Sequence, residues 1–192
     1  MNINFSPDAN IKPERGQVLL SEPFLNDPYF KRTVILLCEH NEEGSFGFVL
    51  NNYIDVELEQ IMENIPIFGN KISIGGPVRN SNLYYIHTLG DQIEDSLEIL
   101  PGVFMGGNFE TLRKKLFSGE VDKNQVRFFV GYSGWSPDQL QAEIKANSWF
   151  VTNVDRETVM DTDIEDLWKV IMKKLGKKGE LISKMPEDPN LN

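Results

Sequence analysis

The stretch TVILLCEHNEEGSFGFVLN, residues 33–51, decides the fold of this 192-residue chain. Its first part, residues 33–38, is β-branched and apolar on both faces, which is typical of a central strand. Residues 40–45 are polar and contain Gly44, which suits a turn with a positive φ. Residues 46–51 then return as a second strand. The stretch therefore predicts an antiparallel hairpin, the strongest such signal in the chain.

Further strands are predicted on both sides of this hairpin, at residues 16–21, 72–74, 83–87, 101–105, 126–131 and 148–152. Helices are predicted after Asp55, after Asn108 and from Ser136, with Pro137 at the first helical position. A last helix is expected from a capping box at residues 162–165 to Gly176. Strands and helices alternate irregularly, which favours an α+β fold with a mixed sheet over a regular doubly wound one.

Length and charge limit the kind of protein. We expect one domain over residues 1–192, with an ordered core of about residues 14–184 and a flexible C-terminal tail. The formal charge is −10, which argues against a surface that binds nucleic acid or an anionic membrane all over. Residues 1–96 carry 6 basic and 14 acidic side chains, so the acidic balance belongs mainly to the half with the hairpin.

The single cysteine, Cys38, excludes an intramolecular disulfide and fits a reducing compartment. Residues 1–15 lack the basic start and apolar middle of a secretory signal. No stretch approaches the ~20 apolar residues of a membrane span. A cytoplasmic protein with no membrane partner is therefore expected. Cys38, His40 and His87 are too few for a structural zinc site, so we predict no metal and no cofactor.

Cys38 and His40 lie two residues apart on the predicted strand and are expected to point to one face, with Cα atoms roughly 6.6 Å apart. Together with His87 they are the first choice for a functional pocket, which would suit a small-molecule-binding protein or a hydrolase. The simpler interpretation is that Cys38 is a small buried hydrophobe and His40 a turn residue. The other candidate pocket residues are Glu39, Asn51, Gly75, Gly76 and Pro77.

Ser133 lies in Gly-Tyr-Ser-Gly-Trp, residues 131–135, between a predicted strand and a predicted helix. This setting invites comparison with the hydrolase nucleophile elbow, Gly-x-Ser-x-Gly. The fifth position is Trp135 instead of glycine, so we prefer a tight strand-to-helix turn with Trp135 in the core. No catalytic residue is assigned. The residues of this structural motif are Gly131, Tyr132, Gly134, Trp135, Ser136 and Pro137.

The C-terminal helix is acidic at its start and basic at its end. This order matches the helix dipole and needs no partner. Weak direct DNA binding through the lysine cluster is the alternative, and its residues are Lys169, Lys173, Lys174, Lys177 and Lys178. A second basic group, residues 113–115, follows the glycine turn at 106–108, where backbone N–H groups could bind an anion. A capped helix with a solvated basic face is the simpler interpretation there.

Four segments, taken together, resemble one bacterial family, the AlgH/YqgE-like proteins. They are GQVLLSEPFL (16–25), VILLCEH (34–40) running on to Asn51, GGPV (75–78) with His87 downstream, and GYSGWSP (131–137) running on to Gln139, Glu143 and Trp149. The resemblance spans residues 16 to about 175. It departs at Asp138, Gln141 and Ser133, where many members have Gly, Glu and Ala, and the last departure weakens the case for Ser133 as a nucleophile.

This resemblance implies a single-domain fold whose bifurcated sheet curls into a pseudo-barrel with flanking helices. The family takes its name from a proposed regulatory effect on alginate synthesis genes, and it has neither a recognised DNA-binding motif nor established catalytic residues. We therefore expect a non-catalytic regulatory or interaction protein with a protein partner of unknown identity. Its effect on transcription would be indirect. Its oligomeric state is left open.

Overall fold

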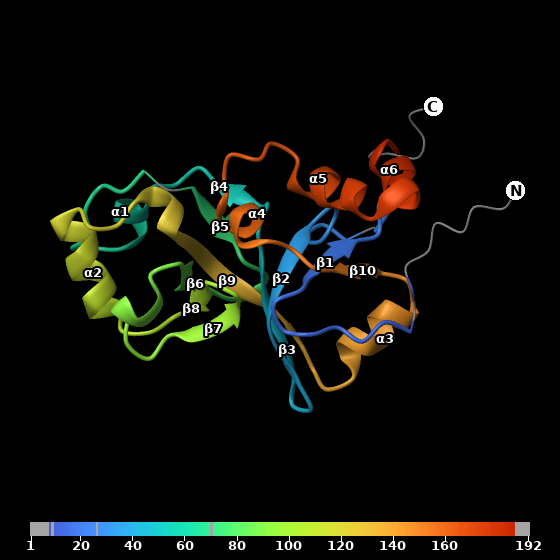
Figure 1. Ribbon diagram of the computed structural model, residues 1–192, viewed down its shortest axis with the longest axis horizontal. Helices are drawn as coiled ribbons and strands as arrows, with labels where there is room; N and C mark the ends of the chain where they lie inside the picture. Colours follow the sequence, from blue (N-terminus) through green and yellow to red (C-terminus); the bar gives the residue numbers. More distant parts are fainter. Residues whose placement is uncertain (1–7, 9, 26, 70, 187–192) are drawn as a thin grey trace, which may run out of the picture.

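The computed structural model describes residues 8, 10–25, 27–69 and 71–186 (Figure 1). The tail predicted to be flexible falls largely on residues 187–192, outside the described residues. The strands are β1 (Val18–Ser21), β2 (Val34–Asn41), β3 (Gly44–Val49), β4 (Tyr53–Ile54), β5 (Ile72–Ile74), β6 (Val78–His87), β7 (Leu97–Leu100), β8 (Val103–Met105), β9 (Val126–Trp135) and β10 (Trp149–Thr152). The helices are α1 (Leu58–Ile61), α2 (Phe109–Ser118), α3 (Gln139–Lys145), α4 (Arg156–Met160), α5 (Leu167–Lys174) and α6 (Gly176–Ser183), with 3-10 turns at Gly90–Gln92 and Lys123–Gln125.

The predicted α+β fold with a mixed sheet is confirmed. The strand order is β10-β1-β2-β3-β9-β6-β8-β7, with β5 joined to β9 and β4 to β5. All pairings among the described residues are antiparallel except that of β5 with β9. The sheet does not close, because its end strands β10 and β7 do not pair with each other in the described part of the chain.

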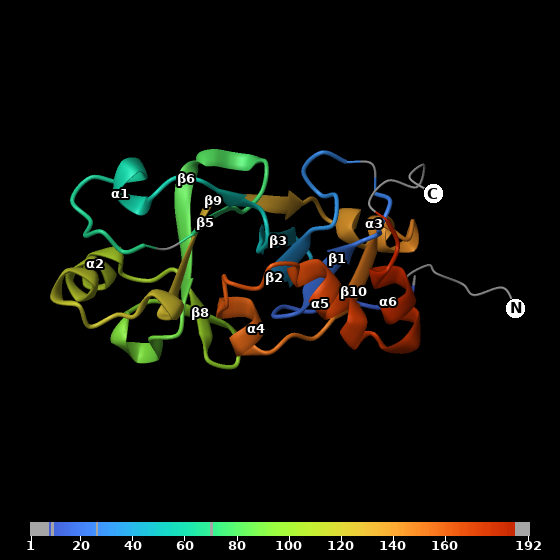
Figure 2. The same ribbon diagram turned by 90° about the horizontal axis from the view of Figure 1, so that it is seen from above.

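Strand β9 joins the two halves of the sheet. Its first residues pair with β5 and β6, and its last three pair with β3. Gly131 lies between these two parts with φ +69, a conformation that side chains other than glycine rarely adopt. The sheet therefore bifurcates at β9, which crosses the middle of the molecule in Figures 1 and 2.

Alternation along the strands decides which helices cover which face. Leu20, Val34 and Leu36 pack in one cluster with buried residues of α4, α5 and α6. Leu19 and Ile35, their neighbours along the strands, pack in another cluster with α3. The other half of the sheet packs its own cluster against α1 and α2. Figure 1 shows α5 and α6 above strands β1 and β10, α3 below them, and α1 and α2 at the other end of the molecule.

Arg127 on β9 is a charged side chain inside this core, only 1% exposed. Its Nη2 donates to the carbonyl oxygen of Leu50 at 2.6 Å, and to the hydroxyls of Tyr53 and Ser73 at 3.3 Å each. Its Nη1 donates to the carbonyl oxygen of Val159 in α4. Val159 is near the end of α4, where backbone carbonyls have no partner within the helix. The guanidinium supplies that partner and so links α4 to the sheet.

Several predicted element boundaries are wrong. The strand expected to end at residue 131 continues to Trp135, because residues 133–135 pair with β3. The next helix begins at Gln139 after an Asp138 N-cap, so Ser136 and Pro137 lie outside it. The capping box expected at 162–165 is also wrong, since Asp166 caps α5 by accepting from the N–H of Lys169. Strands β4 and β7 and helices α4 and α6 were not predicted.

Other boundaries are confirmed. The hairpin forms as β2 and β3. Helix α2 begins after an Asn108 cap that accepts from the N–H of Thr111, and it ends at Gly119 in the left-handed conformation. The helix expected after an Asp55 cap forms, but its predicted start is wrong: its N-cap is Glu57 and its C-cap is Met62, so it is a single turn. No helix in the described part of the chain is both long and apolar enough to cross a membrane.

Candidate functional site

The pocket predicted around Cys38, His40 and His87 does not form. The register of β2 against β3 shifts between Leu37 and Glu39, which marks a β-bulge. An extra residue in a strand reverses the alternation of side chains beyond it. Cys38 therefore lies in the core on the α5 face, whereas His40 lies on the other face, in a surface hollow with residues of α3. The expectation that the two share a face is wrong.

Cys38 is a buried apolar residue of the kind the simpler interpretation describes. It is fully buried, and its Sγ lies 3.6 Å from the carbonyl oxygen of Leu36. Burial raises the pKa of the Cys38 thiol far above its ordinary value, because a thiolate would lose its hydration. A nucleophilic cysteine needs the opposite environment.

The two histidines each have structural partners. The Nδ1 atom of His40 lies 2.8 Å from the Oγ atom of Ser45, across the hairpin. His87 is fully buried: its Nε2 lies 3.1 Å from the carbonyl oxygen of Gly106, and its Nδ1 accepts from the N–H of Leu89. Burial lowers the pKa of His87, so this ring is neutral at physiological pH.

Asn51 and the turn at residues 75–77 also hold the fold. Asn51 accepts from the N–H of Val34 at 2.8 Å and donates to the carbonyl oxygen of Arg32 at 2.9 Å. A Cβ atom on Gly75 would lie 2.3 Å from the carbonyl oxygen of Gly131, and one on Gly76 would lie 2.3 Å from the backbone of Tyr132. These two glycines are therefore needed where the chain crosses β9 in backbone contact. Pro77 is exposed beyond the crossing.

Ser133 lies in extended β9 and not in a strand-to-helix turn, so that expectation is wrong. Its side chain is fully buried, and its Oγ donates to the carbonyl oxygen of Gly75 at 3.1 Å. Neither His40 nor His87 is its hydrogen-bond partner among the described contacts: His40 bonds to Ser45, and His87 bonds to Gly106 and Leu89. The geometry of Ser133 is that of a cross-link between β9 and the glycine crossing.

Trp135 is buried as predicted, and it belongs to a network that explains the rest of the fourth motif. The Nε1 atoms of Trp135 and Trp149 donate to the same carboxylate oxygen of Glu143, at 2.9 and 2.8 Å. Gln139 donates to the other oxygen at 3.0 Å. The two indoles meet edge to face, with centroids 6.2 Å apart. Glu143 thus fixes α3 against the end of β9.

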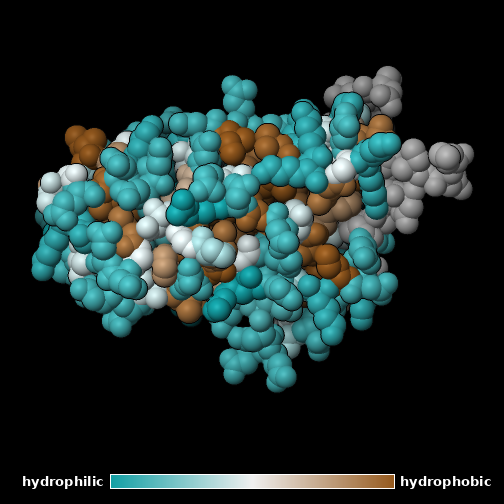
Figure 3. Space-filling view, viewed as in Figure 1, coloured by the Kyte–Doolittle hydropathy of each residue, from teal (hydrophilic) through white to brown (hydrophobic). Residues whose placement is uncertain are grey.

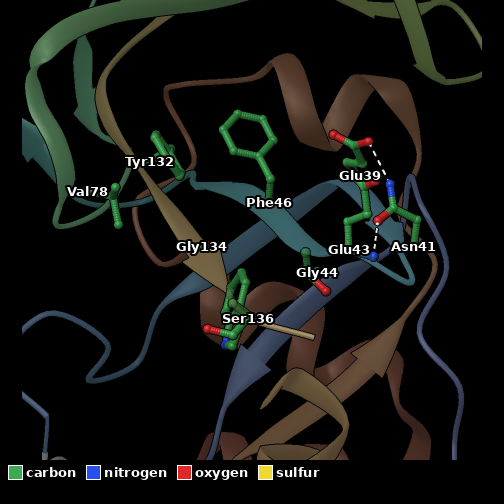
Figure 4. A pocket seen from close by; sticks show the side chains of 11 residues that line it. Glu39, Asn41, Glu43, Gly44, Phe46, Val78, Tyr132, Gly134 and Ser136 are labelled. Carbon is green, nitrogen blue, oxygen red and sulfur yellow. Dashed lines mark hydrogen bonds between the residues drawn. The ribbon is translucent and has the colours of Figure 1, made fainter. Parts of the chain in front are cut away.

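An open groove of about 500 Å³ lies beside this network (Figure 4). We call it the hairpin groove. It is lined by Glu39, Asn41, Glu43, Gly44, Ser45, Phe46, Val78, Tyr132, Gly134, Trp135 and Ser136. Three of the four sequence segments that suggested the family resemblance meet here: the hairpin, the glycine turn and the end of β9. Its volume is within the range of ligand sites.

The floor of the groove combines aromatic rings with a gap. Glu39 pairs with Phe46 across the hairpin, and Phe46 pairs with Gly134 on β9, so these residues form one row. The rings of Phe46 and Tyr132 lie 4.8 Å apart, and both are half-buried. Gly134 is exposed beside these rings and leaves the end of the row without a side chain (Figure 4).

The rim of the groove is polar and acidic. Glu39 accepts from the Asn41 side chain at 2.8 Å, and Asn41 accepts from the N–H of Glu43 at 2.8 Å. These bonds hold the hairpin tip in one conformation. Hydrophilic residues dominate the projection at the bottom of the space-filling view in Figure 3, where Figure 1 places the tip. The groove therefore offers aromatic surface below exposed carboxylates.

Other candidate sites are satisfied internally. At the glycine turn before α2, the N–H groups of Gly106 and Asn108 donate to the carbonyl oxygens of Tyr85 and Glu94, at 3.1 and 2.8 Å. In the C-terminal lysine cluster, Lys174 pairs with Asp155 at 3.1 Å and Lys169 with Asp166 at 3.5 Å. Among the residues that the structure describes, no three His, Cys, Asp or Glu side chains are placed to hold a metal ion.

Sequence reasoning identified part of the groove only. Glu39 stood among the candidate pocket residues, and Tyr132, Gly134, Trp135 and Ser136 among the structural ones. It missed Asn41, Glu43, Gly44, Ser45, Phe46 and Val78. A signal for them existed, because Phe46 and Gly134 each belong to a quoted segment and a strand pairing between those segments would place them side by side. The sequence does not show that pairing.

Comparisons with known proteins agree with this architecture. A family model described as AlgH-like matches residues 18–180. A UPF0301 protein of Bacteroides thetaiotaomicron is 39% identical over 95% of this chain and 93% of its own length. One from Chlorobaculum tepidum is 37% identical, covering 95% of this chain and 96% of its own.

Two solved structures have a similar fold. The solution structure of the AlgH protein from Pseudomonas aeruginosa is 26% identical with a TM-score of 0.72, covering 92% of this chain and 97% of that one. A crystal structure of a Corynebacterium diphtheriae protein, 23% identical, has a TM-score of 0.77 and covers 91% and 94%. The latter likeness concerns the fold alone.

Proposed function

The chain belongs to the AlgH-like family, and from this premise we propose that it is a non-catalytic interaction protein that binds a protein partner through the hairpin groove. The observation that carries the proposal is the convergence of three motif segments on one open groove. The buried residues of these segments, among them Gly75, Gly76 and Ser133, hold the backbone around the groove in place. The more exposed residues of the same segments line the groove. A frame of this kind keeps a surface in a fixed shape, as binding sites require.

The chemistry of the groove suits recognition better than a reaction. Its side chains supply aromatic faces, an amide, three hydroxyls and two carboxylates. The nucleophile candidates lie elsewhere: Cys38 is in the core, and Ser133 is bonded to the glycine crossing. Acid–base catalysis needs a group within hydrogen-bond reach of its partner, and the predicted Cys38–His40 pair is separated by the sheet.

We propose that this protein is cytoplasmic, because a free thiol such as that of Cys38 is kept reduced in the cytosol. Any effect on transcription would pass through the partner, since the acidic rim would repel nucleic acid phosphates. The proposed role is therefore regulatory by association.

Photo-crosslinking tests this proposal. A photoreactive p-benzoylphenylalanine replaces Ser136, which lines the groove, in the bacterium that encodes the protein. The matched control carries it at Glu98, an exposed position on β7. We expect one protein to crosslink from position 136 and not from position 98. Equal crosslinking from both positions, or none from position 136, would refute partner binding through the groove.

A further inference from the structure

We infer that the hairpin groove takes an extended, cationic segment of the partner, which adds as a strand to the free edge of β9 and lays an arginine or lysine side chain over Gly134. This inference rests on the proposed function and specifies its ligand. Three independent observations carry it: a glycine that backbone contacts do not require, an aromatic floor below an acidic rim, and an edge of β9 that no other described strand pairs with.

Gly134 differs from the other glycines around the groove. A Cβ atom on Gly44, Gly47 or Gly76 would lie 2.3–2.4 Å from backbone atoms, so the fold requires glycine there. A Cβ atom on Gly134 would meet only the edge of the Tyr132 ring, at 3.1 Å, and the carbonyl oxygen of Ser45, at 3.9 Å. Gly134 is also absent from the residues with positive φ. The backbone conformation therefore tolerates a side chain here, and packing does so with a shift of a few tenths of an ångström in the Tyr132 ring. The fold does not require glycine at this position as it does at Gly44, Gly47 and Gly76, and an occupant of the groove would explain the gap.

The surroundings of this gap favour a cation. Phe46 and Tyr132 contact each other beside the gap, with ring centroids 4.8 Å apart, and a guanidinium or ammonium group is attracted to the exposed faces of such rings. Glu39 lies next to Phe46 in the same row, and Glu43 lies further along the rim. Among the described residues, those that line the groove include no lysine or arginine. A cationic side chain would thus stack on the rings and pair with a carboxylate.

The backbone next to Gly134 favours an extended chain. Residues 133–135 pair with β3 on one side. On the other side, β6 pairs with Tyr132 through Val78, and the described strand pairings extend no further. A free edge can pair with a strand of another protein, which then presents every second side chain to one face. A strand added beyond Val78 would continue the line of β6 and face the groove with alternate residues.

The test uses three short peptide probes and the full-length protein labelled with 15N. The first alternates threonine and valine around a central arginine. The second carries glutamate in place of the arginine. The third keeps the arginine but has N-methylated backbone amides, which cannot form a strand ladder. Binding is followed by the amide resonances of residues 133–135 and of Phe46. We expect the first probe to shift these resonances and the other two to bind at least about tenfold more weakly.

Variants locate the binding. Gly134→Val and Glu39→Lys should each weaken the arginine probe about tenfold or more. Glu42→Lys is the matched control, because it makes the same charge change in the same hairpin at a residue outside the groove lining, and it should bind the probe as the wild type does. Circular dichroism verifies the fold of each variant. Gly134→Ala, with a smaller side chain, replaces the valine variant if that one does not fold.

Several results would overturn the inference. Equal binding of the arginine and glutamate probes refutes the cationic preference. Undiminished binding of the N-methylated probe, or equally tight binding of arginine methyl ester alone, refutes strand addition and indicates a small-molecule site. If no probe shifts residues 133–135 while a protein still crosslinks from position 136, the proposed function stands and its stated ligand is wrong.

Discussion

Replacing Arg127 by methionine should destabilise the protein by about 2–5 kcal/mol. The change leaves the side-chain volume similar but removes the donors for the carbonyl oxygens of Leu50 and Val159. Each buried acceptor left without its donor costs about 1–3 kcal/mol. Leu50 keeps a long bond of 3.4 Å from Ser73, which reduces its share. Removing the buried guanidinium also removes its own desolvation penalty. The expected loss of unfolding free energy therefore lies below the sum of the two upper values for the acceptors.

Urea unfolding followed by circular dichroism measures this free energy. Arg127→Lys is expected to lose less, because an ammonium group can reach one acceptor but not hold both. Arg156→Met serves as the control, since that side chain is 51% exposed and pairs only with the neighbouring Glu157; we expect a change within about 0.5 kcal/mol. If Arg127→Met also stays within that range, the guanidinium does not hold α4 to the sheet.

Three more predictions concern the motif residues. Glu143→Ala should cost about 3 kcal/mol in urea unfolding, because the Trp135 and Trp149 N–H groups lose a charged acceptor; a loss below about 1 kcal/mol would contradict the network. The unfolding free energy of the wild type should fall as pH drops below 6.5, the ordinary pKa of histidine, because His87 has a lowered pKa in the folded state and only the unfolded chain takes up the proton. His87→Phe should flatten that slope, and an unchanged slope would exclude His87 as its source. Cys38 should react with a thiol reagent such as DTNB only on unfolding, and prompt reaction of the native protein would show that the thiol is accessible.

Local sequence signals predicted much of the fold. Short apolar and β-branched runs located most strands, and the Asn108 and Gly119 caps located α2 because each acts within one turn of helix. The errors occurred where distant pairing outweighs local preference. Residues 131–135 contain two glycines and resemble a turn, yet pairing with β3 keeps them extended. Strand β4 has two residues only, too few for any periodicity.

The candidate pocket failed for a related reason. Its prediction assumed an unbroken strand from Cys38 to His40, and one bulge moved the two side chains to opposite faces. Bulges carry no reliable signal in a single sequence, since they depend on the register of the neighbouring strand. The same bulge places Glu39 beside Phe46 and so makes the groove. The sequence identified many of the motif residues. Which of them support the groove and which line it depends on the pairing of β2, β3 and β9, which a single sequence does not show.

The pairing of β1 with β10 has a consequence for synthesis on the ribosome. Val18 and Leu19 pair with Thr152 and Val151, near opposite ends of the chain. At typical translation rates of about 5–20 residues per second, the second partner emerges roughly 7–27 s after the first. During that interval β1 pairs at most with β2, and its other edge, formed by four residues that are all buried in the finished protein, is open. Until residue 152 has been released, this apolar edge of the nascent chain is open to pairing with other chains.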